Sequence, residues 1–235
     1  MLCFALFSRH YLDRVIGLDG VLWWLLMLCK LENVQLDWPS VCRWHYTDAA
    51  ACVYHEIVLK VGDVLWLQGE NGVGKSTWMR MVSGILPMHG RVSWGVLSQA
   101  GLKTQFYRSM GLDSADDLSV QVFLRQEYLY RTKSVLSEAS CRDYLLQLGL
   151  EAISDDVVGS LSSGQRKRLT MVSLLYDRSA VWLLDEPFVF LDVSARVCLH
   201  ACIQAHVRRG GAVIWSGHDA FGLSSDVLQL VRGYD

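Results

Sequence analysis

The chain has 235 residues, of which 22 are basic and 24 acidic, giving a net charge of −2. This length suffices for one α/β domain with a substantial core, or for such a domain with a smaller lobe, but not for two large domains. No basic stripe or tail is present, which argues against a nucleic-acid partner. The seven cysteines include no C-x-x-C pair, which argues against both a disulfide framework and a zinc site.

The first 29 residues form an apolar extension that differs from the rest of the chain. Its apolar runs, residues 1–7 and 21–29, are both shorter than the ~20 residues that a membrane-spanning helix needs. No basic region precedes the first run, so a signal peptide is not predicted. Two interpretations remain open: a helix lying on a membrane or a partner, with Trp23 and Trp24 at the interface, or synthesis that starts at Met27.

Strands are predicted at residues 31–36, 56–60 and 64–68, and a glycine-rich loop follows the third strand and opens a helix predicted at 78–85. Its glycines allow backbone N–H groups to turn around an anion, and the helix directs its positive end to the same place. Lys75 is expected to reach the β and γ phosphates of a nucleotide, and Ser76 to bind Mg²⁺. The loop reads Gly69-Glu70-Asn71-Gly72-Val73-Gly74-Lys75-Ser76-Thr77.

Beyond a strand at 91–98, the pattern changes. Between about residues 100 and 160, the segments 120–130 and 138–150 carry apolar side chains at helical spacing. This pattern predicts an inserted helical lobe. Strands return at 180–184, 212–216 and 227–231, separated by helices that begin near Ser163 and Val193. This alternation predicts a largely parallel sheet, whose ligand crevice lies at the carboxyl ends of its strands.

A second informative run is a buried strand that ends in two carboxylates. Asp185, at the strand tip, is expected to hold Mg²⁺, and Glu186 to project toward a water that attacks the γ phosphate. The alternative is a solvated strand end without a role in catalysis. The run reads Val181-Trp182-Leu183-Leu184-Asp185-Glu186-Pro187.

A third run precedes an amphipathic helix and reads Leu161-Ser162-Ser163-Gly164-Gln165. Alone it could be a helix start that Ser162 caps. With the two motifs above, it resembles the signature of the ATP-binding subunits of ABC transporters. In that family the signature serine and helix N-terminus face the γ phosphate on the opposite subunit. The resemblance therefore implies a twofold, head-to-tail dimer that encloses two ATP molecules.

The resemblance covers residues 31–231. It implies an α/β P-loop NTPase (RecA-like) fold of the ABC ATPase type, with a mostly parallel sheet, an antiparallel β subdomain and an inserted helical subdomain. The ATP-binding domain would span residues 30–235. Two further positions match the family. His218 matches its switch histidine, which contacts the γ phosphate. Asp192 matches the loop that communicates across the dimer.

The family also uses a glutamine that links Mg²⁺ and the attacking water to the helical lobe. Gln99 is expected to be this residue because it follows a predicted strand, but few residues separate it from the phosphate-loop helix, and Gln105 competes. An aromatic residue of the opening strand stacks on adenine in the family. Trp38 is expected in that position, with Trp44 and Tyr46 as alternatives in the same loop.

Departures from the commonest family pattern narrow the resemblance. The signature carries Ser163 where glycine is usual, Phe188 follows Glu186-Pro187, and Gly101-Leu102-Lys103-Thr104 comes shortly after Gln99. These features resemble the ATP-binding subunit of the haem exporter for cytochrome c maturation. That family implies docking on separate integral-membrane subunits, at the cytoplasmic face of the inner membrane. The alternatives are an ATPase subunit of another importer or exporter, a non-transport ABC protein that acts on ribosomes or DNA, and a small-molecule or nucleotide kinase.

Overall fold

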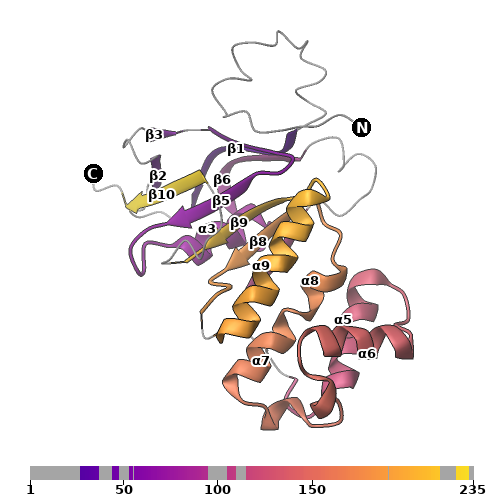
Figure 1. Ribbon diagram of the computed structural model, residues 1–235. Coiled ribbons are helices and arrows are strands. Elements are labelled where there is room, and N and C mark those ends of the chain that lie inside the picture. Colours follow the sequence, from indigo (N-terminus) through magenta and orange to yellow (C-terminus); the bar gives the residue numbers. More distant parts are fainter. Residues whose placement is uncertain are drawn as a thin grey trace.

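The computed structural model describes residues 27–36, 44–47, 53–54, 56–94, 105–109, 115–189, 191–217 and 226–232. Its strands form two sheets. Some helices pack on the larger sheet, and others form a lobe beside it (Figure 1). Among the helices in these ranges, none combines the length and the apolar composition needed to cross a lipid bilayer.

The larger sheet explains how the functional segments come together. Its strands from β10 to β7 are all parallel, whereas β2 and β3 pair antiparallel at one edge. Strands β5, β9 and β8 are parallel neighbours, so their carboxyl ends lie side by side at one edge of the sheet. The strand order is β3 (Val53–Tyr54), β2 (Trp44–Thr47), β10 (Asp226–Arg232), β5 (Val64–Gln68), β9 (Ala212–Ser216), β8 (Val181–Asp185) and β7 (Gln105–Ser109).

The smaller sheet is antiparallel, in the order β4 (Glu56–Lys60), β1 (Met27–Leu36) and β6 (Met88–Trp94). Helix α3 (Lys75–Val82) packs between this sheet and the larger one, with Trp78, Met79 and Met81 fully buried. The predicted combination of a mostly parallel sheet with an antiparallel β subdomain is confirmed.

Alternate residues of β8 and β9 face two separate cores, as the period of a strand requires. Leu183 and Ile214 face the core shared with the smaller sheet and α3. Trp182 and Trp215 face the opposite core, which α9 (Val193–Arg208) and α8 (Val172–Tyr176) cover. Both strands are therefore buried on both faces.

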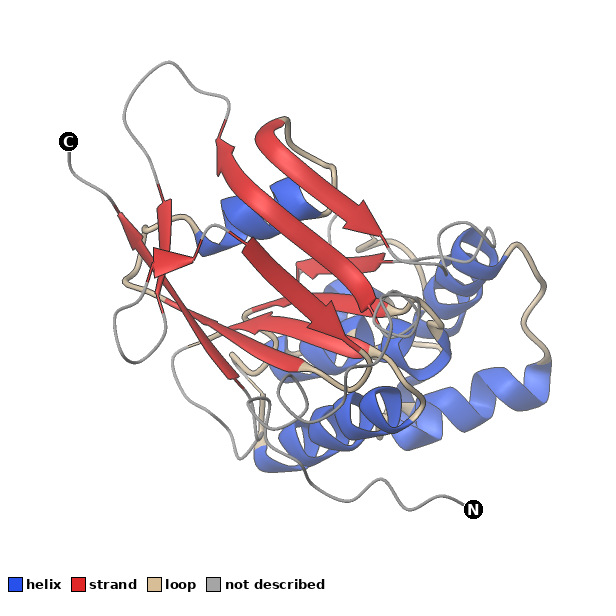
Figure 2. Cartoon of the chain, turned by 90° about the horizontal axis from the view of Figure 1, so that it is seen from above, coloured by secondary structure: helices blue, strands red, loops and turns tan. Residues whose placement is uncertain are grey.

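The remaining helices form a lobe beside the sheet: α5 (Val120–Thr132), α6 (Glu138–Gln147) and α7 (Ser163–Thr170), with short 3₁₀ turns at Glu151–Ile153 and Val158–Ser160. Figure 2 shows most of the helices along one side of the strands. A cluster of tyrosines joins the lobe to α8, since Tyr128 meets Tyr176 edge-on at 4.9 Å. The apolar core of the lobe is continuous with the core under α9.

Several predicted boundaries differ from the structure. The helix predicted at 78–85 begins at Lys75, directly after Gly74, and ends before Gly84, whose φ of 77° suits a helix end. The strand predicted at 91–98 begins at Met88; residues 95–98 lie outside the described ranges. Strand β7 was not predicted, and it falls in the segment assigned to the helical lobe. Strands β2 and β3 were missed as well.

Candidate nucleotide-binding site

The glycine-rich loop joins β5 to α3 and closes around its own lysine. Lys75 is only 7% exposed, and its Nζ donates hydrogen bonds to the carbonyl oxygens of Gly69 (2.7 Å) and Glu70 (3.0 Å). Gly72 and Gly74 have φ values of 79° and 107°, a backbone conformation that other residues rarely adopt. The loop thus holds an ammonium group at the carboxyl end of β5.

The first turn of α3 suits a phosphate. Gly74 precedes the helix and provides no side chain to cap its first backbone amides, an arrangement that suits an anion. The Ser76 hydroxyl lies in the same turn and is half-buried. A hydroxyl here and a carboxylate on β8 are the hard oxygen ligands that Mg²⁺ prefers, so the residues present fit Mg²⁺ bound together with a nucleotide.

The acidic end of β8 is tied to β9 by one serine. Asp185 is the last residue of β8 and is 8% exposed, while Glu186 follows it, half-buried, with a φ of 48°. The hydroxyl of Ser216 donates to Asp185 Oδ1 at 2.8 Å and accepts from the Glu186 backbone N–H at 2.9 Å. Ser216 was not among the predicted site residues. A polar residue at the end of an apolar strand, just before Gly217 and His218, was the available signal.

The charge of a lysine on α7 also interacts with the acidic pair. Burial lowers the pKa of Lys167 to about 8, and the charges of Glu186 and Asp185 act in the opposite direction. This residue lies one helical turn after Ser163, so the signature helix brings a positive charge toward the end of β8. Lys167 was not among the predicted site residues.

The signature run starts α7 through reciprocal hydrogen bonds. The Ser162 hydroxyl accepts from the Gln165 backbone N–H (3.2 Å), and Gln165 Oε1 accepts from the Ser162 backbone N–H (2.8 Å). This is a capping box. Ser163 is exposed, and nothing lies within 4 Å of the position that a Cβ on Gly164 would take. The capping role of Ser162 is confirmed, and the contact of Ser163 with a second subunit stays a prediction.

Asp192 caps α9. Its Oδ1 accepts from the Ala195 backbone N–H (2.8 Å) and from the Ser194 hydroxyl (2.9 Å), and these bonds lower the pKa of the Asp192 carboxyl. The side chain is exposed, so a further contact across a dimer stays a prediction.

Three predicted site residues, Trp38, Gln99 and His218, lie outside the described residues. The backbone of the competitor Gln105 is described. It pairs with Val181, the first residue of β8, at the end of that strand opposite Asp185. Its backbone position does not favour Gln105 as the link to Mg²⁺.

The two alternative adenine platforms, Trp44 and Tyr46, both lie on β2. They pair with Arg232 and Leu230 of β10, toward the antiparallel edge of the larger sheet. The stacking residue itself stays a prediction.

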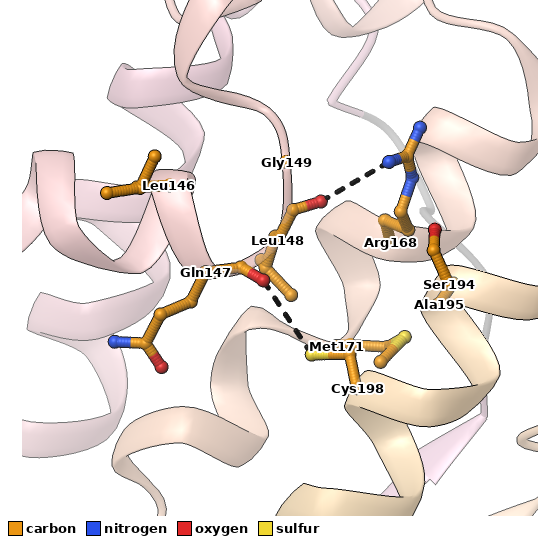
Figure 3. A pocket seen from close by; sticks show the side chains of 9 residues that line it. All are labelled: Leu146, Gln147, Leu148, Gly149, Arg168, Met171, Ser194, Ala195 and Cys198. Atoms are coloured by element: carbon orange, nitrogen blue, oxygen red, sulfur yellow. Dashed lines mark hydrogen bonds between the residues drawn. The ribbon is translucent and has the colours of Figure 1, made fainter.

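A separate cavity of about 220 Å³ lies between the helical lobe and the core, where α6, α7 and α9 meet (Figure 3). Arg168 Nη1 donates to the Leu148 carbonyl at 3.5 Å, and Cys198 Sγ donates to the Gln147 carbonyl at 3.8 Å. No residue of the phosphate loop or of the acidic strand end lines it. The lining residues are Leu146, Gln147, Leu148, Gly149, Arg168, Met171, Ser194, Ala195 and Cys198.

The cysteines of the described segments are free. Cys29 and Cys141 are buried, whereas Cys198 and Cys202 on α9 are half-buried. A hydrogen bond from Cys202 lowers the pKa of Cys198 to about 7. Within the described ranges, no group of three or more His, Cys, Asp and Glu side chains is arranged to hold a metal ion.

Comparisons with known proteins agree with this geometry. Residues 55–189 match the model of the ABC transporter family. A protein named cytochrome c biogenesis ATP-binding export protein CcmA, from Dechloromonas aromatica, is 32% identical over 187 residues, covering 74% of this chain and 88% of that protein. The protein of the same name from Sphingopyxis alaskensis is 34% identical over 197 residues, covering 79% of this chain and 95% of that protein.

Solved structures show the same fold at lower identity. An ATP-binding subunit of an ABC transporter superposes with a TM-score of 0.62 at 22% identity, covering 81% of this chain and 79% of that one. An ATP-binding cassette of an ABC transporter, in its ADP conformation, gives a TM-score of 0.61 at 19% identity and covers 88% and 92% of the two chains. The chain therefore belongs to the ABC transporter family, as one of its ATP-binding subunits.

Proposed function

We propose that this protein is the ATP-hydrolysing subunit of an ABC exporter that serves the biogenesis of c-type cytochromes, with haem as the exported group. The observation that carries the ATPase part is the strand order, since β9 alone separates β5 from β8 and sets the phosphate loop beside the acidic pair. The role in export for cytochrome c biogenesis is supported by the names of the CcmA relatives, which align over 88% and 95% of their own lengths.

Within this proposal each residue at the edge has a role. Lys75 and the first amides of α3 bind the β and γ phosphates of ATP. Ser76 and Asp185 hold Mg²⁺, which offsets phosphate charge when bound. Glu186 orients the attacking water and accepts its proton. Gln99, His218 and Trp38 complete the site as the linking glutamine, the γ-phosphate contact and the adenine platform.

The active unit in this proposal is a twofold dimer of the chain. Ser163, exposed at the start of α7, faces the phosphate held by the second copy, and Asp192 lies near the same contact. A site would then need residues Gly69–Thr77 from one copy and Ser162, Ser163, Gly164 and Gln165 from the other.

Mixing two inactive variants tests this shared site. Lys75→Ala removes a phosphate ligand from the loop of its own chain. Ser163→Arg obstructs the signature of its own chain, which faces the phosphate bound by the other copy. A mixed dimer has one site with both lesions and one with neither, so partial recovery of ATP hydrolysis on mixing is expected. Full activity in each variant alone would contradict the shared site.

The membrane path is assigned to separate integral-membrane subunits, on which the ATPase pair docks at the cytoplasmic face of the inner membrane. Support comes from the word export in the names of the relatives. Purification of the protein from membranes, followed by mass spectrometry of the proteins that accompany it, identifies those subunits.

The cargo is tested in cells that lack their own haem-exporter ATPase. Wild-type protein that co-purifies with the host membrane subunits is expected to restore haem-stained c-type cytochromes in membrane and periplasmic fractions. The Glu186→Gln variant is expected to dock and to fail. If the wild-type protein docks and hydrolyses ATP while cytochrome c stays unmade, the cargo is not haem and the protein serves another transporter.

A further inference from the structure

Ser216, the last residue of β9, is fully buried between the phosphate-loop strand and the acidic strand. It is level with Leu67 of β5, and its neighbour Trp215 is level with Leu184 of β8. Its hydroxyl donates to Asp185 Oδ1 (2.8 Å) and accepts from the Glu186 backbone N–H (2.9 Å). One side chain thus contacts both residues of the acidic pair, 30 or 31 positions away in sequence.

The contact with Glu186 bears on the backbone of the proposed general base. The φ of Glu186 is 48°, a left-handed conformation that costs energy in a non-glycine residue and persists only when the surroundings impose it. The Ser216 hydroxyl holds the N–H of this residue. It thereby fixes the peptide between Asp185 and Glu186 and the direction in which the Glu186 side chain leaves the strand.

The contact with Asp185 bears on the proposed Mg²⁺ ligand. A hydrogen bond accepted on Oδ1 restricts the plane of the Asp185 carboxylate, which matters for a group proposed to bind a metal or its water. Without the hydroxyl, the Asp185 carboxylate loses this hydrogen bond and the orientation that the bond imposes. One serine therefore contributes to the orientation of both acids.

The end of β9 cannot easily shift to release these contacts. The Trp66 indole N–H donates to the Gly217 carbonyl at 3.0 Å, and the Trp66 and Trp215 rings stack with centroids 5.1 Å apart. Phe188 meets Trp215 edge-on at 5.5 Å. A Cβ on Gly217 would come within 2.7 Å of the Trp215 ring, so this position has no room for a side chain.

We propose that Ser216 is a positioning residue for ATP hydrolysis, which aligns the Asp185 carboxylate and the Glu186 backbone from a rigid strand end. This inference rests on the proposed ATPase function and adds a residue to it. Because both hydrogen bonds of the Ser216 hydroxyl go to the acidic pair, ATP binding is expected to persist when the hydroxyl is lost, while turnover falls.

The experiment compares Ser216→Ala with wild type in steady-state ATP hydrolysis. Ser216→Ala is expected to lower kcat roughly 10- to 100-fold, the range typical of a misaligned catalytic group, with KM for ATP changed by less than about 3-fold. The Mg²⁺ concentration for half-maximal activity is expected to rise. Ser173→Ala is the matched control. Ser173 is also fully buried, but it lies on α8, and its hydroxyl donates to the nearby Thr170 carbonyl.

An isosteric pair separates the hydroxyl from the volume of the side chain. Ser216→Thr keeps the hydroxyl and Ser216→Val replaces it with a methyl group, so Thr is expected to turn over ATP faster than Val, whatever the stability of the alanine variant. Equal turnover by the folded Thr and Val variants, or wild-type kcat in folded Ser216→Ala, would overturn the proposal. Absence of ATP hydrolysis by the wild-type protein would instead overturn the proposed function.

Discussion

The two ends of strands β8 and β9 are both fastened by buried polar side chains, but in different ways. At the amino end, His206 stacks on Trp182 with ring centroids 3.9 Å apart and lies 3.3 Å from the Ala212 carbonyl. Asp177 accepts hydrogen bonds there from the Trp182 indole (3.2 Å) and the Ser179 backbone N–H (2.8 Å). At the carboxyl end, Ser216 holds Asp185 and Glu186.

The difference between the ends separates stability from activity. The amino end lies away from the phosphate loop, and its contacts join elements of the core. The carboxyl end combines two acids, a left-handed Glu186 and the nearby charge of Lys167. Such an arrangement is stable only because its surroundings impose it, and it is typical of a functional site. Substitutions at the two ends should therefore change different properties.

The largest expected effect is on turnover at the carboxyl end. Glu186→Gln removes the proposed proton acceptor but keeps the shape of the side chain, so ATP hydrolysis should fall at least ~10²-fold while ATP binding persists. The free energy of unfolding should change little. Phosphate release, nucleotide binding and urea unfolding are measured on the same preparation, with Glu151→Gln, on an exposed 3₁₀ turn, as control. Near-normal turnover by Glu186→Gln would remove Glu186 from its proposed role.

The next effect is a pH-dependent loss of stability at the amino end. Burial lowers the pKa of His206 to about 4 from its ordinary 6.5; Arg209 also lowers it, while the Ala212 bond and Asp177 oppose this. The unfolded state therefore binds a proton that the folded state rejects between these values. The stability that depends on neutral His206 is complete above pH 6.5 and is lost as the pH falls toward 4. The shift corresponds to a loss of about 3 kcal/mol in the free energy of unfolding.

Urea unfolding between pH 7.5 and 4 measures this slope. His206→Gln does not titrate in this range, so its stability should fall less steeply with pH than that of the wild type. Parallel curves for the two proteins would show that His206 is not responsible. ATP hydrolysis per folded molecule at pH 7.5 should be the same for both.

A smaller effect is expected from Asp177→Ala. The substitution leaves the Trp182 indole N–H and the Ser179 N–H without their acceptor, which should lower the free energy of unfolding by about 1–3 kcal/mol. Turnover per folded molecule should stay unchanged, because Asp177 lies at the end of β8 opposite Asp185. A loss of turnover in fully folded Asp177→Ala would mean that the two ends are not independent.

Features formed by consecutive residues could be predicted from the sequence, whereas features formed by residues far apart in the chain could not. The phosphate loop, the capping box of Ser162 and Gln165, and the acidic end of β8 are each written in fewer than ten consecutive residues. Strand β7 depends on pairing with β8, so its five residues alone did not reveal it. Ser216 was missed because its partners lie 30 and 31 positions earlier in the chain, and sequence periodicity does not report such pairs.

Hydrolysis of ATP by the purified chain, measured as phosphate release in the presence of Mg²⁺, tests the central claim most directly. The claim is that the carboxyl ends of β5, β9 and β8 form an ATPase site, in which Lys75 is held at the phosphate position by the Gly69 and Glu70 carbonyls. Wild-type protein should release phosphate, and folded Lys75→Ala should bind ATP weakly and release no more phosphate than the background. Equal phosphate release by the two proteins, or no binding of ATP by the wild type, would contradict the claim.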